Sequence, residues 1–341
     1  MGKREDYFQL SAELRLIKKA NYMKFKILLF ALILPFLLIT NAIAQGKVRI
    51  VVSVDWEGED LQTKNLQAMK DFRRDFPNIP LQQFLNAAYY TKHHADTAWT
   101  TKQIKSVLLP KDEHGLHIHA WKNLVEASGV NFRTSPSFVM DGFMISWCEL
   151  DCGQEIALTG YTNAELRKII AHSIEILNKE GFNRPKSFRA GGWQADDTVL
   201  DALAAEGFTL DSSATYADFL LPEWGKYNLH KMVKNLWAET KPTSQPYIYK
   251  TSSGLKILEL PNNSCLSDYM TGSEMLKVFQ SNAQMLKKNP KKDVYLSIGF
   301  HQETAAEYLP NLREAIRLIR SYSKRNQVPI EFVVAPLKIS F

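Results

Sequence analysis

The stretch KVRIVVSVD, residues 47–55, sets the pattern for most of this 341-residue chain. It is apolar and rich in β-branched side chains, which is typical of a buried strand. Residues 61–76 follow with an amphipathic, charged pattern that predicts a helix. Two carboxylates, Asp55 and Glu57, stand where the strand ends. The stretch therefore opens a strand–helix unit with polar side chains at its carboxyl end.

The same alternation continues to the end of the chain. Further strands are expected within residues 79–90, 115–121, 187–189, 255–260, 294–299 and 330–334, and helices over 97–108, 162–179, 196–206, 273–288 and 309–325. Strands that alternate with helices favour an α/β fold with a mainly parallel sheet. Two stretches interrupt the alternation, residues 122–160 and 214–251. We expect them to be loop insertions in a single domain.

The N-terminal residues 1–44 have a different character. Residues 24–26 are a basic flank, residues 27–39 are apolar, and Asn41–Ala44 end in small side chains, which is the pattern of a secretory signal peptide. The apolar run is short for a membrane helix, which needs about 20 residues; an uncleaved anchor is the alternative. We predict a leader and signal peptide over 1–44, with cleavage leaving a periplasmic or secreted domain over 45–341 and no stable membrane span.

Charge and cysteine content narrow the possible partners. The whole chain carries a formal charge of +6, but most of the excess lies in residues 1–44, so no basic patch indicates nucleic acid binding. Cys148 and Cys152 could form a local disulfide in an oxidising compartment, or all three cysteines could be inert thiols with Cys265 unpaired. The oligomeric state is not predictable from these features.

Two pairs of residues have the spacing of a metal site. Asp55 and Glu57 stand two apart, so a strand end could direct both carboxylates into one pocket. His117 and His119 share one face of a predicted strand, so both rings could reach one ion. Solvated acids and unrelated histidines are the simpler alternatives. His114 is out of phase with the pair and is expected to be exposed.

Two further strand ends carry residues suited to hydrolytic chemistry. Arg189 precedes Gly191-Gly192, and an arginine there could hold a carboxylate in a fixed orientation. His301 follows an apolar strand, where a histidine could donate a proton near neutral pH. A surface arginine and a structural histidine are the alternatives. If the sheet closes into a barrel, all of these strand ends meet on one face.

Taken in order, these segments resemble the polysaccharide deacetylases, the NodB-homology or carbohydrate esterase family 4 group, and in particular its divergent members connected with lipopolysaccharide biosynthesis. The motifs that carry the resemblance are residues 54–57, 113–121, 188–193 with 196–207, and 297–303. The resemblance implies a deformed (β/α) barrel with a divalent metal, usually zinc. It implies that Asp55 is the general base, Arg189 orients it, and His301 is the general acid. The implied metal ligands are Glu57, His117 and His119.

The sequence departs from the family pattern at two points. The second motif usually spaces its histidines as His-x3-His, but Trp121 stands at that position, so His119 must replace the ligand. Trp56 stands where an aspartate ligand is frequent, so Glu57 must reach the metal instead, or Asp55 binds the metal and another group acts as the base. The number of candidate ligands is preserved, which favours an active enzyme.

The resemblance implies a secreted, metal-dependent hydrolase that removes acetyl groups from N-acetylated sugars of a cell-envelope or extracellular polysaccharide. An O-acetyl esterase, an inactive glycan-binding protein on the same fold and a metal-free glycosidase are the alternatives. The second insertion holds five aromatic residues that could stack on sugars or only anchor the loop, namely Tyr216, Phe219, Trp224, Tyr227 and Trp237.

Overall fold

The structure, a computed structural model, describes residues 45–140 and 151–336. Gly46 begins a compact unit. Its strands are β1 (Val48–Asp55), β2 (Gln82–Leu85), β3 (Glu113–Ile118), β4 (Ser187–Ala190), β5 (Leu210–Asp211), β6 (Tyr247–Lys250), β7 (Lys256–Glu259), β8 (Val294–His301) and β9 (Ile330–Val333). Its helices are α2 (Thr63–Asp75), α3 (Thr97–Lys105), α4 (Lys122–Ala127), α5 (Asn163–Lys179), α6 (Asp197–Ala205), α7 (Leu221–Trp224), α8 (Asn228–Leu236), α9 (Gly272–Lys288) and α10 (Ala305–Asn326).

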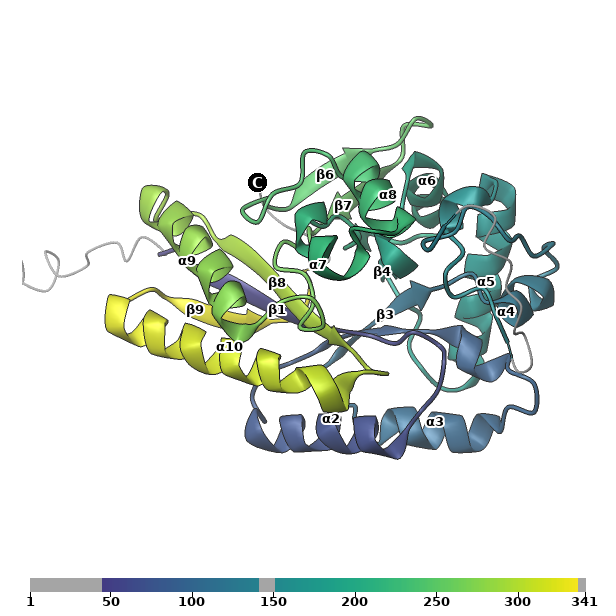
Figure 1. Ribbon diagram of the computed structural model, residues 1–341, viewed down its shortest axis with the longest axis horizontal. Coiled ribbons are helices and arrows are strands. Elements are labelled where there is room, and N and C mark those ends of the chain that lie inside the picture. Colours follow the sequence, from purple (N-terminus) through teal and green to yellow (C-terminus); the bar gives the residue numbers. More distant parts are fainter. Residues whose placement is uncertain (1–44, 141–150, 337–341) are drawn as a thin grey trace, which may run out of the picture. The chain divides into compact units, whose positions relative to one another are not determined.

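One sheet joins all nine strands of the described region. Its order is β6-β7-β5-β4-β3-β2-β1-β8, and β9 pairs with the first half of β1. All neighbours are parallel except β6 and β7. Helices α9, α10 and α2 pack side by side along the outside of the β8–β1 region (Figure 1). The predicted α/β class with a mainly parallel sheet is confirmed.

The sheet is curled. Val51 on β1 packs in a small apolar cluster with Leu210 on β5 and Leu258 on β7, although β2, β3 and β4 lie between these strands in the sheet order. A flat sheet would hold such strands far apart, because neighbouring strands are about 4.8 Å from each other. The curl is the deformed (β/α) barrel predicted from the sequence, open between β6 and β8.

Local sequence signals account for most elements. Thr162 and Glu165 form the predicted capping box of α5, and Thr271 and Glu274 form another at the start of α9. The short strands β5 and β6 were not predicted. The predicted start of α10 was residue 309, whereas the helix begins at Ala305, ahead of Pro310. Because the Ala306 backbone N–H donates to the Asn65 side chain, a tertiary contact supports this first turn.

Both insertions belong to the same compact unit. The first contains α4, and its residues 141–150 lie outside the described region. The second contains α7, α8 and the edge strand β6.

Cys152 is disulfide-bonded and Cys265 is a buried free thiol, which excludes the interpretation of three inert thiols. Cys148, the predicted partner, lies outside the described residues. No helix in the described ranges is long and apolar enough to span a membrane.

Candidate active site

The predicted site residues lie at the carboxyl ends of neighbouring strands. Asp55 ends β1 and is paired in register with His301, which ends β8. His117 on β3 is paired in register with Arg189 on β4. Because the strands are parallel, these side chains all reach the same edge of the sheet. The structure therefore brings together all of the strand-end residues selected from the sequence.

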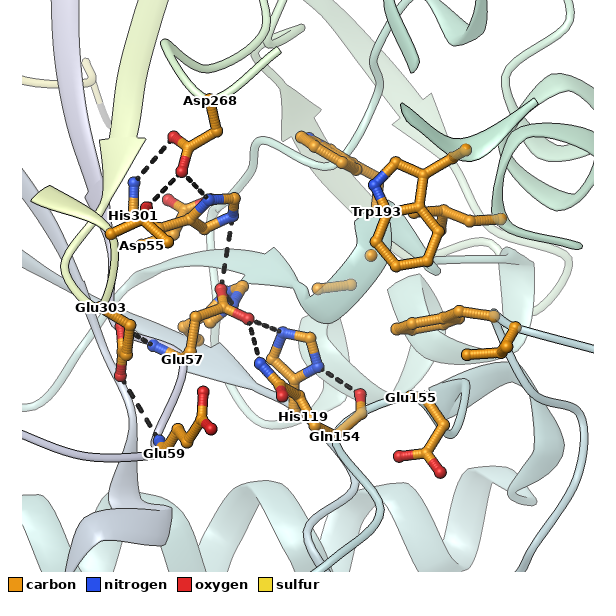
Figure 2. Close-up of a pocket in the computed structure, with 18 of the residues that line it drawn as sticks. Asp55, Glu57, Glu59, His119, Gln154, Glu155, Trp193, Asp268, His301 and Glu303 are labelled. Carbon is orange, nitrogen blue, oxygen red and sulfur yellow. Dashed lines mark hydrogen bonds and ion pairs between the residues drawn. The ribbon is translucent and has the colours of Figure 1, made fainter. Parts of the chain in front are cut away.

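Glu57 lies between histidine side chains. Its carboxylate oxygens are 3.2 Å from Nε2 of His117 and 2.8 Å from Nε2 of His119. One donor atom from each of the three residues falls within 4.8 Å of the others, and all three residues are buried. Figure 2 shows the Glu57 carboxylate between His119 and His301. This buried Glu–His–His group is a candidate metal site.

The hydrogen bonds of the two imidazoles fit a cation at this position. Nδ1 of His117 is 2.8 Å from the Arg189 carbonyl oxygen, and Nδ1 of His119 is 2.6 Å from the Gln154 carbonyl oxygen. A carbonyl only accepts, so each Nδ1 donates to it and each ring turns its Nε2 towards Glu57. Two imidazole nitrogens and a carboxylate that face one another are the donor set of a divalent metal, held by outer hydrogen bonds as in known metal sites.

The surroundings of Glu57 favour its charged form. Burial alone raises the pKa of Glu57, but the charges of His119 and His301 and the hydrogen bonds of its histidines outweigh burial, and the pKa lies well below its usual value. Burial lowers the pKa of His119, whereas the Glu57 carboxylate raises it, and the net direction is upward. Glu57 is therefore held as an anion that attracts positive charge.

Arg189 fixes the carboxylate of Asp55. Its Nη1 donates to Asp55 Oδ1 at 2.8 Å and to the Ser53 hydroxyl at 2.7 Å. Its other donors reach the backbone oxygen and the hydroxyl of Ser212, both at 2.9 Å. The guanidinium also lies 4.6 Å from the centre of the Phe84 ring and is almost fully buried. A buried arginine with this many partners holds Asp55 in one orientation.

His301 is paired with an acid that the sequence analysis missed. Nδ1 of His301 is 3.0 Å from Asp268 Oδ1, and its Nε2 is 3.5 Å from Glu57 Oε1. Burial alone lowers the pKa of His301, but the charges of Asp268 and Glu57 outweigh it and raise the pKa to about 10. Asp268 follows β7 in a segment without helical or strand periodicity, so only the fold reveals the pair.

Two further residues contact Glu57, and the sequence did not predict either of them. The Gln154 amide donates to Glu57 Oε2 at 2.9 Å, and its backbone oxygen holds His119. Glu303 accepts the backbone N–H of Glu57 at 3.1 Å and the hydroxyl of Tyr89. Burial and the nearby charge of Glu57 raise the pKa of Glu303 to about 8. These contacts come from the first insertion and from the turn after β8.

His114 is not part of the group. It is half-buried on the same strand and packs on Phe182, so the expectation of an exposed ring was wrong. Its burial lowers its pKa. The strand alternation explains the separation, because residue 114 faces away from residues 117 and 119 on the other side of the sheet.

A cavity of about 710 Å³ opens above the Glu–His–His group. Its floor includes Asp55, His117 and His301, while both insertions contribute to its walls. Of the five aromatic residues singled out in the second insertion, Trp224 and Tyr227 line the cavity. The other three do not; Trp237, for example, is buried and donates to the Trp193 carbonyl oxygen. Two of these rings therefore line the cavity, whereas Trp237 anchors the insertion to the core.

Comparison with known proteins gives structural matches only. No family model and no curated protein sequence matches the chain. A Mycobacterium smegmatis protein named as a polysaccharide deacetylase matches with 12% identity over 87% of this chain and 94% of its own, at a TM-score of 0.49. The family 4 carbohydrate esterase from Streptomyces lividans matches with 10% identity over 82% and 89%, at 0.37.

A Bordetella bronchiseptica protein named as a polysaccharide deacetylase involved in O-antigen biosynthesis matches with 11% identity over 86% of this chain and 87% of its own, at a TM-score of 0.36. The chain is thus similar in structure to polysaccharide deacetylases and carbohydrate esterases, at low sequence identity.

Proposed function

We propose that this protein is a secreted, metal-dependent hydrolase that removes acetyl groups from N-acetylated sugars of a cell-envelope or extracellular polysaccharide. The observation that carries the proposal is the arrangement around Glu57. The Glu57–His117–His119 group lies with Asp55, held by Arg189, and His301, held by Asp268, in one cavity. A metal site with a fixed carboxylate and a fixed histidine has the parts that amide hydrolysis requires.

Each fixed side chain has a distinct task in this proposal. A bound divalent metal would polarise the acetyl carbonyl and acidify a water molecule. Asp55 accepts the proton from the attacking water, in an orientation set by Arg189. His301, with its pKa of about 10, is protonated at neutral pH and donates the proton from Nε2 to the departing nitrogen. A C–O bond forms between the water oxygen and the acetyl carbon, the C–N bond breaks, and acetate and a free amino sugar leave.

The cavity suits a carbohydrate. Its volume of about 710 Å³ lies within the range of small-molecule sites, which is about 300–1,000 Å³. Trp193, Trp224 and Tyr269 supply apolar ring surface, and the metal group supplies convergent polar atoms. Flat ring faces pack well on the C–H faces of sugars, whereas the hydroxyl groups remain free for polar contacts.

The first test is metal content and acetate release on residues 45–341. We expect about one divalent ion per chain, and acetate released from N-acetylglucosamine oligomers that chelation abolishes and metal restores. His117→Ala should lose both the ion and the activity. His114→Ala is the matched control, because it removes an imidazole from the same strand outside the group.

Two results would contradict the proposal. Acetate release that is insensitive to chelation would remove the role of the metal group. Retention of glycan without turnover, in protein that holds its metal, would favour the glycan-binding alternative on the same fold.

A further inference from the structure

The cavity is strongly acidic. In the described region eight carboxylates line it and no lysine or arginine does. A cavity lined by one sign of charge concentrates ligands of the opposite sign and repels those of its own sign.

Five of these carboxylates are held by partners: four by a cationic side chain or as part of the metal group, and Glu303 by hydrogen bonds. Asp55 is paired with Arg189, Asp268 with His301, and Glu57 belongs to the metal group. Asp151 lies 3.2 Å from the Lys92 ammonium, and Glu303 accepts the Tyr89 hydroxyl and backbone N–H groups. The four with charged partners therefore contribute little net charge to the space above the site.

The remaining three, Glu59, Glu155 and Glu223, have no ion-pair partner among the residues that the structure describes. They come from three segments: the turn after β1, the first insertion and helix α7. Figure 2 draws Glu59 and Glu155, in addition to the group around Glu57.

An aromatic pair at the same cavity favours positive charge as well. The rings of Trp224 and Tyr227 lie edge to face, with centroids 5.6 Å apart, and both line the cavity. Tyr227 is 42% exposed. The faces of such rings attract ammonium groups through their quadrupoles. The aromatic pair and the unpaired carboxylates thus point to the same kind of ligand.

We propose that this cavity selects glycans without anionic groups next to the reacting sugar, and that it prefers chains that already carry free amino groups. This inference rests on the proposed deacetylase function. Uronate, phosphate or sulfate groups near the reacting sugar face Glu59, Glu155 and Glu223 and are repelled. An ammonium group on a neighbouring sugar is attracted by the same three carboxylates and by the aromatic pair.

The products fit the same charge pattern. Acetate is an anion, so the acidic walls favour its departure. The amine product is protonated near neutral pH and stays attracted to the walls. A chain therefore becomes a better ligand as its deacetylation proceeds.

The test compares three oligosaccharides of equal length: an N-acetylglucosamine oligomer, its partly deacetylated form, and a hyaluronan oligomer in which glucuronate alternates with N-acetylglucosamine. Affinity is measured by calorimetry and turnover by acetate release, on the metal-loaded protein at low and high salt. We expect the partly deacetylated oligomer to bind best and hyaluronan at least about ten-fold more weakly than the neutral oligomer, with the difference shrinking at high salt.

A charge variant makes the test specific to the three carboxylates. Glu59→Gln/Glu155→Gln/Glu223→Gln should remove most of the discrimination and leave metal content unchanged. Glu239→Gln is the control, because Glu239 is exposed and does not line the cavity. Equal binding of hyaluronan and the neutral oligomer by the unchanged protein would overturn the inference, as would discrimination that persists in the triple variant.

The two proposals fail in different ways. If the three oligosaccharides bind in the expected order but none releases acetate, the proposed function fails and the charge selection stands. If acetate is released equally from all three, with equal affinities, the function stands and the charge selection fails.

Discussion

The floor and the walls of the cavity differ in how firmly they are held. The floor consists of strand-end side chains such as Asp55 and Arg189, which are 2% and 1% exposed and closely hydrogen-bonded. The walls come from the insertions, where Tyr227 is 42% exposed and Glu155 and Glu223 have no ion-pair partner in the described region. The sheet fixes the groups proposed for the chemistry, whereas the insertions supply more exposed groups to the walls.

Gln154 joins the two regions. It belongs to the first insertion, yet its backbone oxygen holds His119 and its side chain contacts Glu57. Its segment is braced by the buried Asp151–Lys92 pair and by the disulfide of Cys152. One wall of the cavity therefore also supports the candidate metal site. Substitution of Gln154 can show how strongly the two regions depend on each other.

The largest effect is expected in the floor, at Arg189. Arg189→Met leaves the buried Asp55 carboxylate without its charged partner, which should cost about 3–5 kcal/mol of unfolding free energy and abolish acetate release. The double variant Asp55→Asn/Arg189→Met removes both charges and should regain most of the stability while remaining inactive. Denaturant unfolding and acetate release measure the two effects. A single variant as stable as the unchanged protein would show that the floor is not held by this pair.

The next effect concerns the pH profile. Asp268 raises the pKa of His301, so its loss should lower that pKa from about 10 towards the ordinary histidine value of about 6.5. His301 donates a proton in the proposed reaction, so the alkaline limb of the kcat profile of Asp268→Asn should move to lower pH. Asp218→Asn is the control, because Asp218 faces His230 away from the cavity lining. An unshifted alkaline limb would contradict the pairing role of Asp268.

A smaller effect is expected where wall and floor meet. Gln154→Ala removes the amide that contacts Glu57 but keeps the backbone oxygen on His119. Outer contacts of metal ligands are worth about 10–100-fold in metal affinity, so we expect about ten-fold weaker binding. Competition with a chelator measures it. Gln67→Ala on the exposed face of α2 is the control. Equal metal affinity in the two variants would show that Gln154 does not support the metal site.

The smallest effect is expected in the wall itself. Trp224→Ala removes one ring of the aromatic pair, and a loss of about 1 kcal/mol corresponds to about a five-fold higher KM. Metal content and kcat should not change. Trp99→Ala removes an exposed ring that does not line the cavity and serves as the control. A lower kcat with unchanged KM would instead show that Trp224 acts in the chemical step, like the residues of the floor.

Sequence reasoning succeeded where a local pattern carries the information. Thr162 with Glu165 marked the start of α5, and the apolar run 47–55 marked β1. The strand ends then identified Glu57, His117 and His119, which the fold gathers into one group. It was less successful at short strands such as β5, since two residues have no periodicity to detect.

The sequence by itself determined the α/β class, the order of the main elements and the polar side chains at the strand ends. It could do so because periodicity, capping and composition are properties of neighbours along the chain. Only the tertiary structure decided that Asp268 pairs with His301, that Gln154 supports His119, and that Glu59, Glu155 and Glu223 have no ion-pair partner in the described region. Most of these residues lie in loops and turns, and their positions depend on how the curled sheet brings distant segments together.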